Sequence, residues 1–399
     1  MNRADAVHFE GEGERSIREK KTMTSRERLL AVLHGEVPDC VPCCPDISNM
    51  VPCRLTGKPF WDIYAFQDPP LWKAHIDALK HFDIDGGFEI YSFGTVDPVT
   101  GHESPMEERV VSRYDDGRFV TQGFNRDSEN WASTVVVYTA DNPPATHVKP
   151  DSIGLPNTPP EWEPLTGVKE WSQGFELWKL IKKELDDQGV LAQQSGMSTC
   201  LIGNADAVYE HFDNPEGTRK RAQQMMDNVE CRMDLIARLD PKPDFLLCGG
   251  SGSLMFTSPD DWRKLVLPVL KRATALAREL GIPTHVHSCG PEKELVAMAA
   301  EETDLTVIDP LEVPPMGDCD LADLKKRFGS KIVLKGNLHT TEVMLRDNTE
   351  EVRKASRKAI DDGGAGGGFI LSTGDQCGRD TPDENLRAMV ETARTYGRY

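Results

Sequence analysis

Residues 258–290 read SPDDWRKLVLPVLKRATALARELGIPTHVHSCG, and this stretch sets the expectation for the whole chain. Ser258 and Pro259 are typical of a helix start, apolar residues then recur at helical spacing, and Gly281 is typical of a helix stop. The apolar run 282–289 that follows indicates a buried strand. A helix followed directly by a buried strand is the repeating unit of an α/β protein with parallel strands.

The same unit recurs along the chain. Further apolar runs bounded by Gly, Pro or Asp indicate buried strands at 40–47, 85–92, 189–196, 244–251, 305–310, 331–337 and 367–374. Helical patterns separate most of these runs, including 321–329 and 348–364. Eight strands with intervening helices, in a chain of 399 residues, predict a (β/α)8 TIM barrel, with a doubly wound open sheet as the alternative.

One region departs from this alternation. Residues 108–140 alternate apolar and polar side chains around the turn-forming DDG, which predicts a β-hairpin, and proline-rich chain follows it. We therefore expect an insertion at about 100–165, after the second strand, on the side of the barrel where active sites lie. The expected organisation is a flexible N-terminal arm at 1–22 and one catalytic barrel domain at 23–399.

Composition excludes several classes of function. The net charge of −19 disfavours binding to nucleic acid or to anionic membranes. No apolar run approaches the ~18 residues of a membrane helix, and the polar start lacks the apolar core of a secretory signal. These features predict a cytoplasmic protein, in which the ten cysteines are not expected to form a disulfide framework.

Three polar residues alternate along the strand at 282–289. His285, His287 and Cys289 are spaced by two, so they share one face of the strand, and Cys289 lies at its carboxyl end. Hydrogen-bonded core histidines beside an inert cysteine are the simpler interpretation. A metal site becomes the better interpretation if a third ligand exists at the same rim.

Cys377 is the candidate third ligand. It follows the eighth predicted strand, and closure of a barrel would bring its loop to the same rim as Cys289. His287, Cys289 and Cys377 together form a good zinc set that leaves a fourth position open, as in catalytic rather than structural zinc sites. By contrast, C-x-x-C at Cys40 and Cys43 contains a proline and lacks a matching pair, so we interpret it as packing.

The rule that barrel active sites lie at the carboxyl ends of strands predicts further site residues. Asp309 and Glu89 are the expected acids. For Asp309 and Asn337, capping of the next helix is the open alternative. The residues expected to bind substrate are His285, Asn337, Tyr91 and Cys248.

At this point the residues resemble a known family. The stretch 258–290, then LKGNL at 334–338 and CGRDTPDENLRAMVETAR at 377–394, resemble the uroporphyrinogen decarboxylase superfamily, in its zinc- and cobalamin-dependent methyltransferase branch. The resemblance extends over roughly 24–399, and implies a barrel with zinc on His287, Cys289 and Cys377. The decarboxylases themselves need no metal and carry an arginine-rich motif near the first strand, where this chain has only Arg54.

The resemblance implies a corrinoid-dependent methyltransferase. Zinc would polarise the heteroatom of a methylated small molecule, such as a methoxylated aromatic, with Asp309 or Glu89 neutralising the leaving group. The methyl group would pass to the cobalt of cobalamin carried by a separate corrinoid protein. Transfer from methylcobalamin to a thiol and metal-free decarboxylation are the alternatives, and homodimerisation is left open.

Overall fold

The computed structural model describes residues 22–90 and 94–399. The N-terminal part of the chain contains α1 (Ser25–Leu33), α2 (Met50–Leu55), α3 (Phe60–Tyr64), α4 (Leu71–Phe82), β1 (Met106–Arg113), β2 (Phe119–Asn125), β3 (Asn130–Tyr138), β4 (Ala145–Val148), β5 (Glu163–Pro164) and α5 (Gly174–Leu185). The remainder contains β6 (Ala192–Gln194), α6 (Ala205–Asp213), α7 (Pro215–Ile236), β7 (Phe245–Leu247), α8 (Pro259–Leu265), α9 (Leu267–Glu279), β8 (Thr284–His287), α10 (Lys293–Glu302), β9 (Val307–Asp309), α11 (Leu321–Phe328), β10 (Val333–Leu338), α12 (Thr349–Gly363), β11 (Phe369–Thr373) and α13 (Asp383–Thr395).

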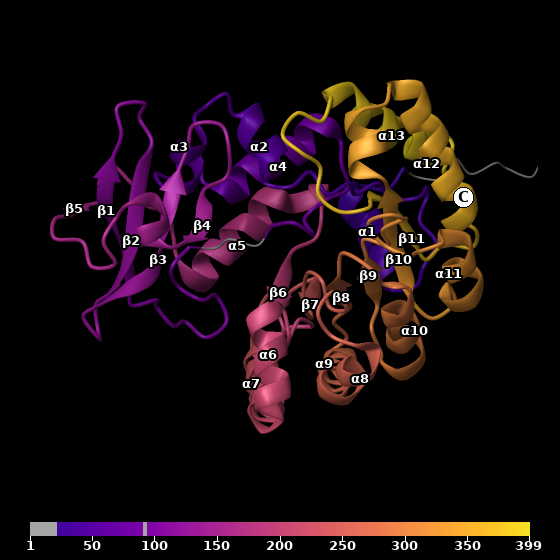
Figure 1. The fold of residues 1–399 in the computed structure, drawn as a ribbon. Helices are drawn as coiled ribbons and strands as arrows, with labels where there is room; N and C mark the ends of the chain where they lie inside the picture. Colours follow the sequence, from indigo (N-terminus) through magenta and orange to yellow (C-terminus); the bar gives the residue numbers. More distant parts are fainter. Residues whose placement is uncertain (1–21, 91–93) are drawn as a thin grey trace, which may run out of the picture.

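Six strands form a parallel sheet in the order β11-β10-β9-β8-β7-β6. Five of the six lie within runs that the sequence predicts as strands, β10 extends one residue beyond its predicted run, and helices surround the sheet (Figure 1). The predicted α/β class with a parallel sheet is therefore confirmed. Helix α1 packs across this sheet, because Leu29 and Val32 share a buried cluster with Phe245, Val307 and Ile370.

The first two predicted strands are less regular. Cys43 forms a parallel bridge with Leu371 of β11, and Gly86 forms one with Gly189, just before β6. Between these two segments, the amide of Asp85 donates to the carbonyl of Cys43 at 2.9 Å. The ladders are short because Pro42 and Pro45 lack an amide proton and Gly87 has a positive φ of +107°. Closure into an eight-stranded barrel stays a prediction.

The region predicted as a hairpin insertion contains a larger antiparallel sheet. β1 and β2 pair across the turn at 114–118, as the DDG pattern predicts, and the sheet continues to five strands in the order β4-β3-β2-β1-β5. It lies at one side of the molecule, next to α2 and α3 (Figure 1). Phe119, Tyr138 and Val110 pack there against Trp61 and Tyr64.

One predicted helix is divided in the structure. The sequence pattern predicts a single helix over 258–281, whereas α8 ends at Leu265 and α9 begins at Leu267. The cause is Pro268, which has no amide proton for the bond to residue 264 and whose ring disfavours a continuous helix there. By contrast, α11 and α12 coincide with the predicted helices 321–329 and 348–364.

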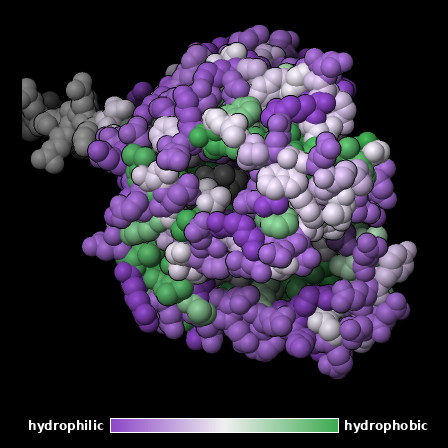
Figure 2. Space-filling model, turned by 90° about the vertical axis from the view of Figure 1, so that its left-hand side faces the viewer, coloured by the Kyte–Doolittle hydropathy of each residue, from purple (hydrophilic) through white to green (hydrophobic). Residues whose placement is uncertain are grey.

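The view in Figure 2 shows a largely hydrophilic face with scattered hydrophobic side chains, as the net charge of −19 predicts. Over the described residues, every helix is too short or too polar to cross a membrane. The predicted arm at 1–22 lies outside the described residues except for Thr22, and so does Tyr91.

Candidate active site

The polar residues of the candidate site come from three adjacent strands. His285 and His287 lie on β8, Asp309 ends β9, and Lys335 lies on β10. In the ladder between β8 and β9, His287 is directly opposite Asp309. Because these strands are neighbours in a parallel sheet, alternate residues along them point to the same side and meet.

Asp309 lies at the centre of this group. Its Oδ1 accepts hydrogen bonds from Nε2 of His285 at 2.8 Å and Nδ1 of His287 at 3.0 Å, and its Oδ2 accepts one from Nζ of Lys335. Burial alone would raise the pKa of this carboxyl, but Lys335 and the two imidazoles outweigh burial and hold the pKa well below its usual range. Asp309 is therefore ionised and accepts every one of these bonds.

This arrangement fixes the orientation of His287. Because Nδ1 donates to Asp309, Nε2 faces the other way, where Oδ1 of Asp375 lies 3.7 Å from it. Burial would lower the pKa of His287, but Asp309 raises it well above the usual value, and a hydrogen bond with the Cys289 thiol raises it further. A carboxylate that orients one imidazole nitrogen and frees the other is the usual support of a histidine that binds metal.

Gly290 ends this segment directly after Cys289. Its φ of +95° lies in the left-handed region, and a Cβ there would lie 2.6 Å from Sδ of Met255. Glycine is therefore required for the chain to turn away at this point. The turn leaves Cys289 partly exposed beside His287 at the end of β8.

Cys377 lies near this pair but is not joined to it. Its amide donates to the carbonyl of Asp46 at 2.8 Å, and burial raises the pKa of its thiol to about 12. Asp46 and Asp375 influence both Cys377 and His287 electrostatically, so the two side chains have common neighbours. Within 22–90 and 94–399, however, no three His, Cys, Asp or Glu side chains are grouped so that they could hold a metal ion.

The mouth of the candidate site is the region around Nε2 of His287 and the Cys289 thiol. Glu89 is buried near this mouth and is 5% exposed. Its Oε1 is 3.6 Å from Nζ of Lys335 and 3.8 Å from Sγ of Cys44. Burial raises the pKa of Glu89 to about 8, although Lys335 opposes this shift. This carboxyl therefore keeps its proton at neutral pH.

Two residues that the sequence predicts as substrate-binding are enclosed instead. His285 is 1% exposed, and its ring packs edge-on against Phe88 with centroids 5.2 Å apart. Cys248 is fully buried, and burial raises the pKa of its thiol to about 12. Neither side chain reaches the mouth, because both belong to the packed layer around the strands.

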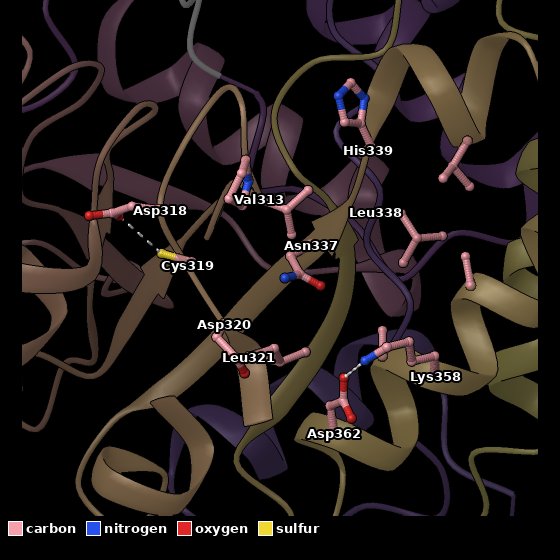
Figure 3. A pocket seen from close by; sticks show the side chains of 14 residues that line it. Val313, Asp318, Cys319, Asp320, Leu321, Asn337, Leu338, His339, Lys358 and Asp362 are labelled. Carbon is pink, nitrogen blue, oxygen red and sulfur yellow. Dashed lines mark hydrogen bonds and ion pairs between the residues drawn. The ribbon is translucent and has the colours of Figure 1, made fainter. Parts of the chain in front are cut away.

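Asn337, the third residue predicted to bind substrate, also lies apart from His287. Its side chain lines a separate cleft between α11 and α12, together with Leu338 and His339 (Figure 3). The residues that line this cleft include none of the three predicted zinc ligands. Asn337 is therefore not brought to His287.

Sequence reasoning missed three acidic residues around the mouth. Asp46 and Asp375 are described above, and Oε2 of Glu312 accepts a hydrogen bond from the amide of Gly290 at 2.5 Å. Asp375 has a φ of +94°, which is a strained conformation for a residue other than glycine and is enriched at functional sites. Each of the three lies within or just after a predicted strand, so the rule used for Asp309 would also have found them.

The family model for uroporphyrinogen decarboxylase (URO-D) matches residues 251–396. Methylcobamide:CoM methyltransferase MtbA of Methanosarcina mazei is 31% identical over 170 residues, which are 42% of this chain and 44% of that protein. Residues 251–396 are thus similar to the uroporphyrinogen decarboxylase family, and the relatives that match part of the chain include methyltransferases.

Two further proteins are similar to this chain. Uroporphyrinogen decarboxylase of Thioalkalivibrio sulfidiphilus is 26% identical over 233 residues, which are 55% of this chain and 63% of that protein. A solved structure described as a methyltransferase from Methanosarcina mazei has a TM-score of 0.60 at 15% identity, covering 94% of this chain and 99% of that one. This likeness shows a common fold.

The superfamily match is uneven along the chain. The alignments with the MtbA proteins span less than half of the length of those proteins. The family-model match includes His287, Cys289, Asp309 and Cys377, whereas the antiparallel sheet β1–β5 lies outside it. The candidate site is therefore in the part that this superfamily shares, and the antiparallel sheet is outside that part.

Proposed function

We propose that this protein is a zinc-dependent methyltransferase that moves a methyl group from a methylated small molecule, such as a methoxylated aromatic, to the cobalt of a corrinoid protein. The observation that carries the proposal is the contact series Asp309–His287–Cys289 at the end of β8. The names of the MtbA relatives support the class of reaction.

The donor set fits zinc in its chemistry. An imidazole whose Nε2 faces away from Asp309 and two cysteine thiols are ligands that zinc prefers, and Asp309 supplies the supporting carboxylate. Cys377 would have to turn toward His287 and lose its hydrogen bonds with Thr373 and Thr381. A zinc ion bound by His287, Cys289 and Cys377 would supply Lewis acidity to the heteroatom that carries or receives the methyl group.

The surrounding residues divide the remaining tasks. Asp309 is ionised and has no proton to donate, so we assign it the positioning of His287 rather than the predicted acid role. Glu89 keeps its proton at neutral pH and retains the predicted role of proton donor to the leaving group. Lys335, which contacts both carboxyl groups, holds them beneath the mouth.

The direction of transfer has two candidates. The five-stranded antiparallel sheet beyond the family-model match favours a dedicated pocket for a methyl donor. The name methylcobamide:CoM methyltransferase of the first relatives favours the reverse transfer, from a methylated corrinoid to a small acceptor. The wider proposal includes a closed (β/α)8 barrel, completed by the segments around Cys43 and Gly86, in a cytoplasmic protein.

Metal analysis and two spectroscopic assays test the proposal. The purified protein should contain about one zinc per chain, whereas a metal-free decarboxylase should contain none. His287→Ala and Cys289→Ala should lose both zinc and methyl transfer, while Cys231→Ala, at an exposed cysteine on α7, should keep both. Full transfer activity in folded His287→Ala protein would refute the proposal.

The cobalt spectrum then decides the direction. In one assay the protein is mixed with a reduced corrinoid protein and methoxylated aromatics, and the forward proposal expects the absorbance of methylated cobalt to appear. In the other it is mixed with methylcobalamin and coenzyme M, and loss of that absorbance would support the reverse direction. A change in neither assay would leave zinc content as evidence for a site but would contradict the proposed transfer.

A further inference from the structure

A second cleft lies on the outer side of β10, between α11 and α12, and has a volume of about 440 Å³ (Figure 3). This volume is within the range of ~300–1,000 Å³ that is typical of small-molecule sites. Its walls are mostly apolar, with side chains from Val313, Leu321, Leu338, Val343, Ala355 and Ala359. The cleft can therefore enclose an apolar body of modest size.

Asn337 supplies a polar group in the middle of this cleft. Figure 3 shows its side-chain amide above Leu321, and among the described residues nothing donates to or accepts from that amide. Asn385 on α13 behaves differently, because its Nδ2 donates to the carbonyls of Met344 and Asp347 at 3.0 and 2.9 Å. Only Oδ1 of Asn385 is left without a partner, whereas the whole amide of Asn337 is unpaired among the described residues and offers one acceptor and two donors to an occupant.

His339 adds a donor at one end of the cleft. Its Nδ1 accepts hydrogen bonds from the amides of Thr341 and Glu342, each at 3.2 Å. In the neutral imidazole the accepting Nδ1 places the proton on Nε2, which is then a donor without a partner among the described residues.

The charges around the cleft select against anions. Three carboxylates and one ammonium line it, namely Asp318, Asp320, Asp362 and Lys358. Asp318 and Asp320 accept from amides at the starts of α10 and α11, and Lys358 is paired with Asp362. Because these charges sum to 1 − 3 = −2 and the only cation is already paired, an anionic ligand would be repelled.

We propose that this cleft binds a small uncharged molecule with a flat apolar body and a carboxamide-type edge. Such an edge presents a donor beside an acceptor, which pairs with the amide of Asn337 through two hydrogen bonds, while the body packs on the walls from α11 and α12. The site is separate from the proposed metal centre, because no predicted zinc ligand lines it.

Calorimetric titration of the full chain with benzamide tests this inference. Benzoate is the comparison ligand, because it has the same shape but is an anion and lacks the amide donor. Benzamide should bind saturably with a Kd of about 1 mM, and benzoate at least about tenfold more weakly. Asn337→Leu should weaken benzamide binding by about tenfold, which corresponds to two lost hydrogen bonds. Ala355→Phe should abolish it by filling the cleft.

Controls separate the site from the fold and from the metal centre. Lys354→Phe adds the same ring to α12 at a side chain that is 76% exposed and outside the cleft, and should bind benzamide as the natural chain does. His287→Ala should also bind it unchanged. Unchanged binding in folded Asn337→Leu or Ala355→Phe protein, equal affinity for benzoate, or no saturation by about 20 mM benzamide would each overturn the inference.

Discussion

Two buried aspartates lie at the centres of two ionic networks, and they differ mainly in their partners. Asp85 is fully buried, and its carboxylate binds the guanidinium groups of Arg28 and Arg394 at 2.7–2.9 Å. Asp309 is 2% exposed and binds two histidines and a lysine. The first network contains cations that stay charged at every accessible pH, whereas the second contains groups that gain and lose protons.

We interpret the first network as structural and the second as part of the candidate site. Arg28 lies on α1 and Arg394 lies on α13. Asp85 therefore joins these two helices to the segment around Gly86, which forms a bridge with Gly189 just before β6. Asp309 instead orients His287, whose other nitrogen faces the mouth. The two central aspartates are similarly buried and each is paired with cations. The titratable partners of Asp309 are therefore the feature that distinguishes the candidate site.

Asp85→Asn should have the largest effect. Removing the charge takes away the buried carboxylate that both guanidinium groups share, so the free energy of unfolding should fall by about 3–5 kcal/mol. Urea unfolding followed by circular dichroism measures this fall. Asp83→Asn is the matched control, because Asp83 faces the same Arg394 at 3.6 Å but is 74% exposed and should change the free energy by less than about 1 kcal/mol. Equal effects of the two changes would contradict the distinction.

Glu89→Gln should show that the second network titrates. The pKa of Glu89 is raised from 4.5 to about 8 in the folded protein, so the folded state binds this proton more tightly than the unfolded state. Stability from this proton is complete below pH 4.5 and is lost as the pH rises through about 8. Between pH 5 and 8 the natural protein should lose about 2–4 kcal/mol of unfolding free energy relative to Glu89→Gln. A difference that is independent of pH would contradict the assignment.

Asp309→Asn should weaken the proposed metal site without removing a ligand. The neutral amide cannot serve as an acceptor for both histidines and the lysine, so His287 loses its fixed orientation. Zinc affinity, measured by competition with a chromophoric chelator, should fall about 10–100-fold. Asp304→Asn removes an exposed carboxylate that pairs with Arg278 and should leave the affinity unchanged. The same affinity in both variants would show that Asp309 does not support the site.

Most of the fold followed from local patterns in the sequence. The six strands of the parallel sheet coincide with largely apolar runs bounded by Gly, Pro or Asp, and these boundaries identified them. The segments around Cys43 and Gly86 form only bridges, because prolines and a positive-φ glycine remove regular ladder geometry. The extent of the antiparallel sheet was underestimated, because β4 and β5 are four and two residues long and carry little pattern.

The candidate site was predictable only in part. Alternation along β8 identified His285, His287 and Cys289 as one face, but not which of them is enclosed. Lys335 was missed, because a buried lysine within an apolar run is visible only once β9 places Asp309 beside it. Asn337 was assigned to the wrong surroundings, since the direction of its side chain depends on how α11 and α12 pack.

Asp39→Asn should give the smallest effect and tests how far the structural network extends. Asp39 accepts a hydrogen bond from Nε of Arg28 at 2.8 Å but is 17% exposed, so water replaces part of what is lost, and the cost should be about 1 kcal/mol at pH 7. Burial would raise the pKa of Asp39, but the bond with Arg28 outweighs it and lowers the pKa below 3.8. The stability it contributes is therefore present above pH 3.8 and lost as the pH falls through the lowered value, so the natural and variant proteins should converge in unfolding free energy as the pH falls below 3.8. If Asp39→Asn lowered the unfolding free energy at pH 7 as much as Asp85→Asn does, the contribution of each carboxylate would not depend on its exposure. Burial would then not explain why Asp85 contributes most to the stability of this network.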